Sequence, residues 1–159
     1  MTADTNARRQ SGLAPALDSR AAQLIADLAL EPHPEGGFYR QIYRSDSQAT
    51  PDDGRPSRAS LTTIYFLLPG HDVSRWHVVQ SDEVWHFYEG APLELFTADA
   101  RFIHIDTHRL GEVGPDTTPV HVVPARQWQA ATDDRCLHAG GMHGRTGLRV
   151  RRLRHGSRR

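Results

Sequence analysis

The sequence predicts a mainly β protein, an antiparallel sandwich or barrel preceded by one short helix. From position 61 onward, short strand-like segments follow one another at intervals of roughly 8 to 12 residues. Glycines and prolines separate these segments, as they do in antiparallel folds with many turns. The single helical pattern comes before all of the strands, which argues against the alternating strands and helices of a dinucleotide-binding sheet.

The first periodic element is a short helix near residue 20. Leu24, Ile25 and Leu28 fall on one face of such a helix. Asp18 or Ser19 is placed to cap its first turn. Two prolines that follow closely end it, because the residue before a proline avoids the helical conformation.

The strands begin after a Glu-Gly-Gly turn. Residues 38–44 combine the aromatic and branched side chains that suit a strand. Residues 50–57 are rich in Pro, Gly and Asp, as a loop is. The later strands are expected at residues 61–68, 83–88, 93–96, 101–107 and 120–123.

Length and composition fit one domain with a buried core. Of the 159 residues, 38% are hydrophobic and 24% are charged, which excludes global disorder. The longest apolar run, residues 64–68, is far shorter than the roughly 20 residues of a membrane-spanning helix. The first twenty residues resemble no signal peptide, and the single Cys136 cannot form an internal disulfide. We therefore expect a cytoplasmic protein that contacts no membrane.

Charge and patterning divide the chain into three expected segments. Residues 1–17 are small and polar and are expected to form a disordered arm. Residues 18–135 are expected to form the folded domain. Residues 136–159 form a basic tail with seven arginines and no acidic residue, whereas all 19 acidic residues precede it. The net charge of zero therefore combines −7 before the tail with +7 in it.

Residues 74–93 carry the side chains best suited to chemistry. They read SRWHVVQSDEVWHFYEGAPL, in which His77 precedes Glu83, and Gly90 stands seven residues after that glutamate. This spacing resembles the first motif of the cupin superfamily. The resemblance implies a small jelly-roll barrel in which two histidines, a glutamate and a later histidine face a central cavity.

Five segments resemble, more narrowly, the cupin_5 family of unknown function, also called DUF985. They are residues 31–40 (EPHPEGGFYR), 63–67 (TIYFL), 81–86 (SDEVWH), 90–93 (GAPL) and 122–128 (VVPARQW). The resemblance covers roughly residues 20 to 132. It implies a homodimer where the barrel is intact.

Two of the four usual cupin metal ligands are missing. Val79 stands at the second histidine of the first motif, and Trp128 stands where the second motif, Pro-x-Gly-x-x-His, has its histidine. A catalytic transition metal generally takes three protein ligands, and the candidates here are His77, Glu83 and His86. On an unbulged strand, His86 points away from Glu83 because their offset is three. We expect no cofactor or an unknown one, with a divalent transition metal as the alternative.

The resemblance favours small-molecule binding in a pocket lined by histidine and glutamate, with a sugar-type isomerase or epimerase as the activity. His77 would be the general base, Glu83 its orienting carboxylate or a ligand acceptor, and Tyr39 or Tyr65 the acid. Further ligand contacts are expected from Glu35, Arg40, His86, Trp85 and Trp128. The alternatives are a metal-dependent cupin oxygenase and a non-catalytic ligand-binding protein.

Other polar residues have structural interpretations. Burial of an unpaired carboxylate is costly, so Glu83 would need Arg40 or Arg44 as its partner. Residues 104–108, His-Ile-Asp-Thr-His, alternate with a period of two and indicate the solvated face of a strand. Gly36 and Gly37 allow a tight turn or the close approach of a ligand, and both interpretations stay open.

The basic tail also has two interpretations. Its arginines and glycines could bind nucleic acid without specificity, but we expect no specific nucleic-acid partner. Reading each codon from residue 138 one base later, with synonymous choices, can give TLVGCMVAPGFEFADF, which resembles the closing segment of a cupin_5 domain. We therefore expect a frameshift near residues 133–137 that disrupts the closing strands, although Leu148, Val150 and Leu153 could still form a short strand.

Overall fold

A computed structural model describes residues 19–70, 72–133 and 147–154, so the predicted arm and most of the tail lie outside the described residues. The described residues contain one helix, α1 (Ser19–Asp27), and twelve strands. The strands are β1 (Glu31–Pro32), β2 (Phe38–Arg44), β3 (Gln48–Ala49), β4 (Arg58–Ala59), β5 (Leu61–Leu68), β6 (Val73–Val78), β7 (Asp82–Glu89), β8 (Leu93–Ala98), β9 (Ile105–Leu110), β10 (Val120–Val123), β11 (Trp128–Asp133) and β12 (Gly147–Arg154).

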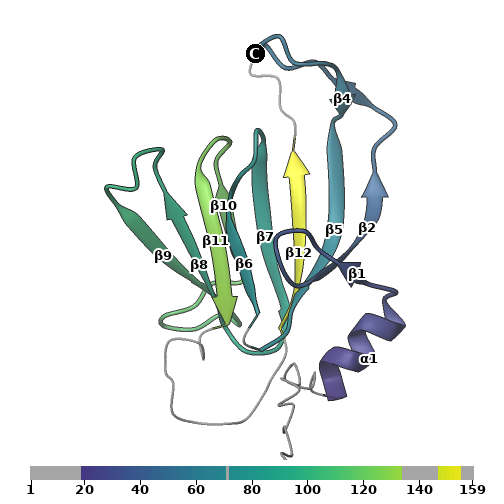
Figure 1. The fold of residues 1–159 in the computed structure, drawn as a ribbon, viewed down its shortest axis with the longest axis vertical. Helices are drawn as coiled ribbons and strands as arrows, with labels where there is room; N and C mark the ends of the chain where they lie inside the picture. Colours follow the sequence, from purple (N-terminus) through teal and green to yellow (C-terminus); the bar gives the residue numbers. More distant parts are fainter. Residues whose placement is uncertain (1–18, 71, 134–146, 155–159) are drawn as a thin grey trace, which may run out of the picture.

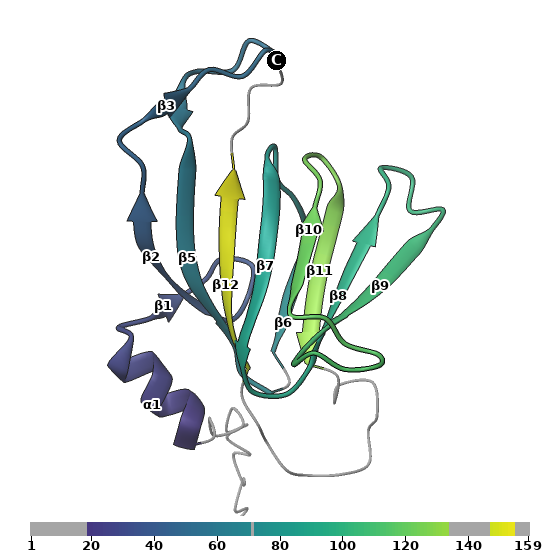
Figure 2. The same cartoon turned by 180° about the vertical axis from the view of Figure 1, so that it is seen from behind.

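The strands form two main antiparallel sheets. One has six strands in the order β1-β2-β5-β12-β7-β10, and the other has four in the order β6-β11-β8-β9 (Figure 1). The same arrangement is seen from behind in Figure 2, where β3 and β4 stand apart as a small hairpin. The mainly β architecture predicted from the sequence is confirmed. Over the described residues the ladders make separate sheets rather than one closed cylinder.

Most predicted strands occur where the sequence placed them, and one is shifted. β2, β5 and β10 have the expected bounds, whereas the strand expected at residues 101–107 begins only at Ile105. Asp99 explains the shift, because its Oδ1 accepts the backbone N–H of Arg101 at 2.8 Å and folds residues 99–103 into a turn. The strands β6 and β11 were not predicted.

The helix ends at Asp27, five residues before Pro32. Ala29 has a positive φ of 48°, and the N–H of Leu30 donates to the carbonyl of Ile25 at 2.9 Å. This is the hydrogen-bond pattern of a helix end closed by a left-handed residue. Leu30 is thereby turned toward the sheet, where it packs with Leu24 and Leu67.

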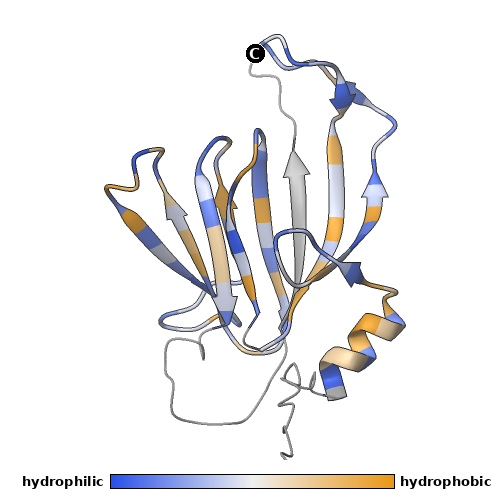
Figure 3. Cartoon of the chain, viewed as in Figure 1, coloured by the Kyte–Doolittle hydropathy of each residue, from blue (hydrophilic) through white to orange (hydrophobic). Residues whose placement is uncertain are grey.

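The residues of β5 divide between the two faces of the six-stranded sheet. Leu67 and Tyr65 pack with the apolar residues of α1, which gather on that helix in Figure 3. Phe66 and Leu68 point the other way, into the space between the sheets, because successive residues of a strand alternate. The core there is formed by Phe66, Leu68, Trp85, Leu93, Leu95, Leu110, Val123 and Ala131.

The closing strand is present over residues 147–154. β12 pairs antiparallel with β5 from Gly147↔Leu68 to Arg154↔Leu61, and with β7 on its other side. β5 and β7 are therefore not exposed sheet edges along this length. Among the residues described, no helix combines the length and the apolar character that a membrane crossing requires.

Candidate functional site

The turn between β1 and β2 lies against β6 and carries Glu35. The backbone N–H of Arg75 donates to the Glu35 carbonyl at 2.8 Å, and the Arg75 guanidinium donates to the carbonyl of Pro34. Gly36 has a φ of +109°, and a Cβ there would lie 2.1 Å from the carbonyl oxygen of Val73. Position 36 therefore requires glycine because the backbone of β6 approaches it closely. Of the two interpretations, the tight turn explains Gly36 without a ligand.

This turn brings the carboxylate of Glu35 to His77. Their Oε2 and Nε2 atoms are 3.3 Å apart, with 32% of the Glu35 side chain and 10% of the His77 side chain exposed. His77 Nδ1 donates to the carbonyl of Arg75 at 2.7 Å. Since a carbonyl only accepts, Nδ1 carries a proton, and Nε2 is the atom left to exchange protons with Glu35 or a ligand.

Glu83 is buried and is held by an amide. Gln129 Nε2 donates to the carboxylate of Glu83, and Trp85 Nε1 donates to Gln129 Oε1 at 3.0 Å. An indole N–H only donates, so Trp85 fixes which end of the amide faces the carboxylate. The expectation that Arg40 or Arg44 partners Glu83 is therefore wrong for Arg40, which donates to the carbonyl of Leu28 instead.

Gln129 was missed by the sequence analysis, which assigned the second-motif histidine to Trp128. Counting five residues from Pro124 in Pro-x-Gly-x-x-His reaches position 129 rather than 128. The backbone supports this alignment, since Arg126 at the glycine position has a positive φ of 68°. Gln129 is also in register with His77 across β6 and β11.

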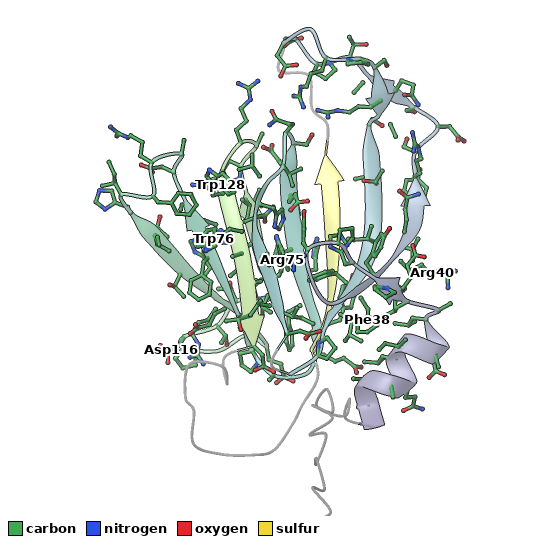
Figure 4. All side chains as sticks on the ribbon, viewed as in Figure 1. Phe38, Arg40, Arg75, Trp76, Asp116 and Trp128 are labelled. Atoms are coloured by element: carbon green, nitrogen blue, oxygen red, sulfur yellow. The ribbon has the colours of Figure 1, made fainter. Side chains whose placement is uncertain are left out.

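Trp128 lies on the face of β11 opposite to Gln129, where its ring packs with those of Phe102 and Trp76. Its ring centroid is 5.3 Å from that of Phe102, which is 5.1 Å from that of Trp76. Figure 4 shows Trp76 and Trp128 on this sheet, away from the helix side where Arg40 is labelled. The expectation that Trp128 lines one cavity with His77 and Glu83 is wrong.

The two candidate tyrosines lie on different faces. Tyr39 packs against the core between the sheets, and the Glu31 carboxylate, by its charge and a hydrogen bond, raises the pKa of Tyr39. Tyr65 packs under the helix with Leu24 and Leu67. Of the two, only Tyr39 shares the interior with Glu83 and Trp85.

The proposed metal ligands do not converge. His86 falls on the face of β7 opposite to Glu83, as its offset of three residues predicts. Within residues 19–70, 72–133 and 147–154, no three His, Cys, Asp or Glu side chains are grouped so as to hold a metal ion. Gln129 turns its donor end, rather than an oxygen, toward Glu83. These residues therefore do not fit the metal of the usual cupin site.

A stacked histidine pair was also missed. The rings of His108 and His121 have centroids 3.7 Å apart, and His108 Nε2 is 3.0 Å from Thr97 Oγ1. Burial lowers the pKa of both rings, and the charge of His108 lowers that of His121 further. His104 and Asp106 are exposed as predicted, although His104 precedes β9, whereas His108 is partly buried and its ring stacks on His121 of β10. The adjacency of β9 and β10 cannot be seen in the local pattern.

These observations define a two-sheet β protein in which His77 contacts Glu35, and Gln129, in register with His77, donates to the buried Glu83. Residues 22–138 match the family described as Cupin superfamily (DUF985), and the chain belongs to that family. The family resemblance and the jelly-roll fold predicted from the sequence are thus confirmed.

Solved structures of similar proteins support the assignment. The crystal structure of a protein from Shewanella oneidensis has 29% identity and a TM-score of 0.71, over 87% of this chain and 79% of that one. A hypothetical protein from Leishmania major has 28% identity and a TM-score of 0.73, over 84% and 80%. Vicilin from tomato, Solanum lycopersicum, has 9% identity and a TM-score of 0.53 over 79% and 30%, and shows the fold alone. No curated protein sequence matches the chain.

Proposed function

We propose that this chain binds a small sugar-type molecule and removes a proton from a carbon next to its carbonyl group, as an isomerase or epimerase does. The contact between Glu35 and His77 carries this proposal. It supplies a base with an oriented ring, a nearby carboxylate and partial exposure to solvent. General bases of this kind contribute about 10² to 10⁴-fold to the rate of a proton transfer.

Each part of the pair has a role in that chemistry. The Arg75 carbonyl holds the proton on His77 Nδ1, which leaves Nε2 as the basic atom. When Nε2 takes a proton from the substrate, the Glu35 carboxylate at 3.3 Å stabilises the positive ring. Glu83, kept as an acceptor by the Gln129 amide, would accept a hydrogen bond from a hydroxyl of the bound molecule.

The other two functions have less support. A metal-dependent oxygenase needs ligands that converge, and His86 lies on the wrong face of β7 to join His77 and Glu83. A non-catalytic ligand-binding protein would use the same interior but would not need a base beside a carboxylate. Turnover of a substrate distinguishes the isomerase or epimerase from the non-catalytic ligand-binding protein.

Exchange of substrate hydrogen with solvent tests the proposal. The protein is incubated in D2O with a panel of ketoses, aldoses and sugar nucleotides, and deuterium at the carbon beside the carbonyl is followed by NMR. His77→Gln and Glu35→Gln should reduce the exchange strongly. His104→Gln is the matched control, because His104 is exposed on a turn. Binding without exchange by the parent protein would favour the non-catalytic function.

A further inference from the structure

We propose that the stacked rings of His108 and His121 form a pH-sensitive latch between the two sheets, which holds β9 against β10 at neutral pH and releases it when both rings take a proton. β9 is the edge strand of the four-stranded sheet, and β10 is the edge strand of the six-stranded sheet. The latch therefore lies on the seam where the two sheets meet. It does not depend on the proposed chemistry at His77.

The backbone joins the two edges only near the start of β10. The N–H of Thr118 donates to the carbonyl of Arg109 at 3.1 Å, and the N–H of Gly111 donates to the carbonyl of Thr118 at 3.0 Å. Leu110 and Thr118 form an isolated bridge, whereas β8 and β9 pair in a continuous register. Contact along the rest of the seam therefore depends on side chains.

The two histidines make such a contact over the core. Their ring centroids are 3.7 Å apart and their planes are inclined by 23°. His108 Nε2 lies 3.0 Å from Thr97 Oγ1, which ties this ring to β8. His121 is opposite Trp85 and His108 is opposite Leu95, so the rings share a face with these two residues. Because Trp85 and Leu95 are fully buried, the stack covers the interior at this seam.

Protonation acts against the stack. Burial lowers the pKa of both rings, and the charge of His108 lowers the pKa of His121 further. The closed seam thus favours two neutral rings, whereas rings released into water titrate near their ordinary pKa of about 6.5. Two charged rings in contact repel each other strongly, because no water separates them. As the pH falls below this value, the open form binds protons more readily and becomes more populated.

The other groups around the rings do not cancel this effect. The Asp106 carboxylate raises the pKa of His108, but burial lowers it by more. Thr97, Leu95 and Trp85, which face the rings from β8 and β7, do not ionise in this pH range. The other ionisable residues on the seam, or on the inner face beside it, are Glu83, Arg109, Glu112 and Asp116. The pKa shifts of the two rings come from burial, from Asp106 and from His108.

Hydrogen exchange of the full chain, measured by NMR at pH 7.5 and 5.5, tests the latch. The amides of Gly111 and Thr118 report on the seam, and the amide of Phe87, which donates to the Pro119 carbonyl at 2.8 Å, reports on the contact between β7 and β10. After correction for the intrinsic pH dependence of amide exchange, protection at the seam should fall roughly tenfold at pH 5.5, whereas Phe87 should keep its protection. Constant protection at the seam would overturn the proposal. An equal loss at Phe87 would also overturn it, because the whole sheet would then be opening.

Two variants separate the charge of the rings from their packing. His121→Phe keeps an aromatic ring on the stack but cannot take a proton. The loss of seam protection should shrink to roughly threefold, because opening then takes up one proton instead of two. His104→Gln, at an exposed position before β9, is the matched control and should reproduce the tenfold loss. A tenfold loss that persists in His121→Phe would overturn the proposal.

His108→Gln removes the stack while its amide can still bond to the Thr97 hydroxyl. Seam protection in this variant should already be low at pH 7.5 and should change little at pH 5.5. Protection equal to that of the parent at pH 7.5 would show that the stack does not hold the seam, and the proposal would be wrong.

Discussion

Gln129 donates its side-chain amide to the carboxylate of Glu83, at two of the positions that hold metal ligands in the usual cupin motifs. Trp85 fixes the orientation by donating to the amide oxygen. A hydrogen-bond donor thus stands where a cupin metal would accept an electron pair. This relationship explains why His77, Glu83 and Gln129 do not fit the metal of the usual cupin site.

Restoring two histidines should create a metal site. Val79→His combined with Gln129→His would add the two missing ligands to His77 and Glu83, so this variant should hold about one equivalent of a divalent transition metal. The parent, purified without added metal, should hold well under one equivalent. Elemental analysis measures both, with Val79→His combined with Gln127→His as the control. A tightly held ion in the parent would contradict this account of Gln129.

Removal of the amide should destabilise the fold. Gln129→Leu removes one hydrogen bond to the buried carboxylate of Glu83 and one from the Trp85 N–H. The expected loss is about 2 to 4 kcal/mol in the free energy of unfolding. Urea unfolding measures it, and Gln127→Leu, at a less buried neighbouring position, should have little effect. Equal losses in the two variants would show that the hydrogen bonds do not matter.

Acid should weaken the fold through the stacked histidines. Burial lowers the pKa of His108 and His121 below 6.5, so the unfolded chain binds protons more readily than the folded chain as the pH falls below this value. The stabilisation is complete above pH 6.5 and decreases toward acid, partly opposed by Asp106, whose charge raises the pKa of His108. The loss should be moderate because both rings are partly exposed.

Melting temperatures between pH 7.5 and 5 measure this dependence. His121→Gln should flatten the decrease, since one titrating ring is gone and the other loses its charged neighbour. His104→Gln, at an exposed position, should keep the slope of the parent. A parent whose stability increases as the pH falls through this range would contradict the assignment.

Restoring the expected cupin_5 ending in place of β12 should stabilise the fold. This strand lies between β5 and β7, yet residues 147–154 contain four arginines. The TLVGCMVAPGFEFADF ending, aligned from residue 138, replaces three of these four arginines and brings three phenylalanines into the strand, and burial of apolar surface stabilises by about 25 cal/mol per Å². The restored chain should therefore melt at a clearly higher temperature. Equal melting temperatures would reject the frameshift as a cause of lost stability.

The family and the fold could be predicted because their signals are local. Aromatic and branched side chains and flanking turn residues located β2, β5 and β10, and the spacing of His77, Glu83 and Gly90 pointed to the cupin motif. The shift of β9 followed from one side chain, Asp99, which holds a turn that the alternation of apolar residues does not reveal.

The partners within the site could not be predicted because they depend on tertiary contacts. Glu35 reaches His77, 42 residues later in the chain, only because the turn that carries Glu35 packs on β6. His108 meets His121 only because β9 and β10 come together across the two sheets. Gln129 was different, since a correct count from Pro124 would have found it.

The most direct test of the central claim is deuterium exchange at the carbon beside the substrate carbonyl, measured by NMR on protein treated with a strong chelator. The account predicts exchange that persists after chelation, is lost in His77→Gln and is unchanged in His104→Gln. Exchange that stops on chelation and returns only with added metal would contradict the claim that Glu35 and His77 do this chemistry.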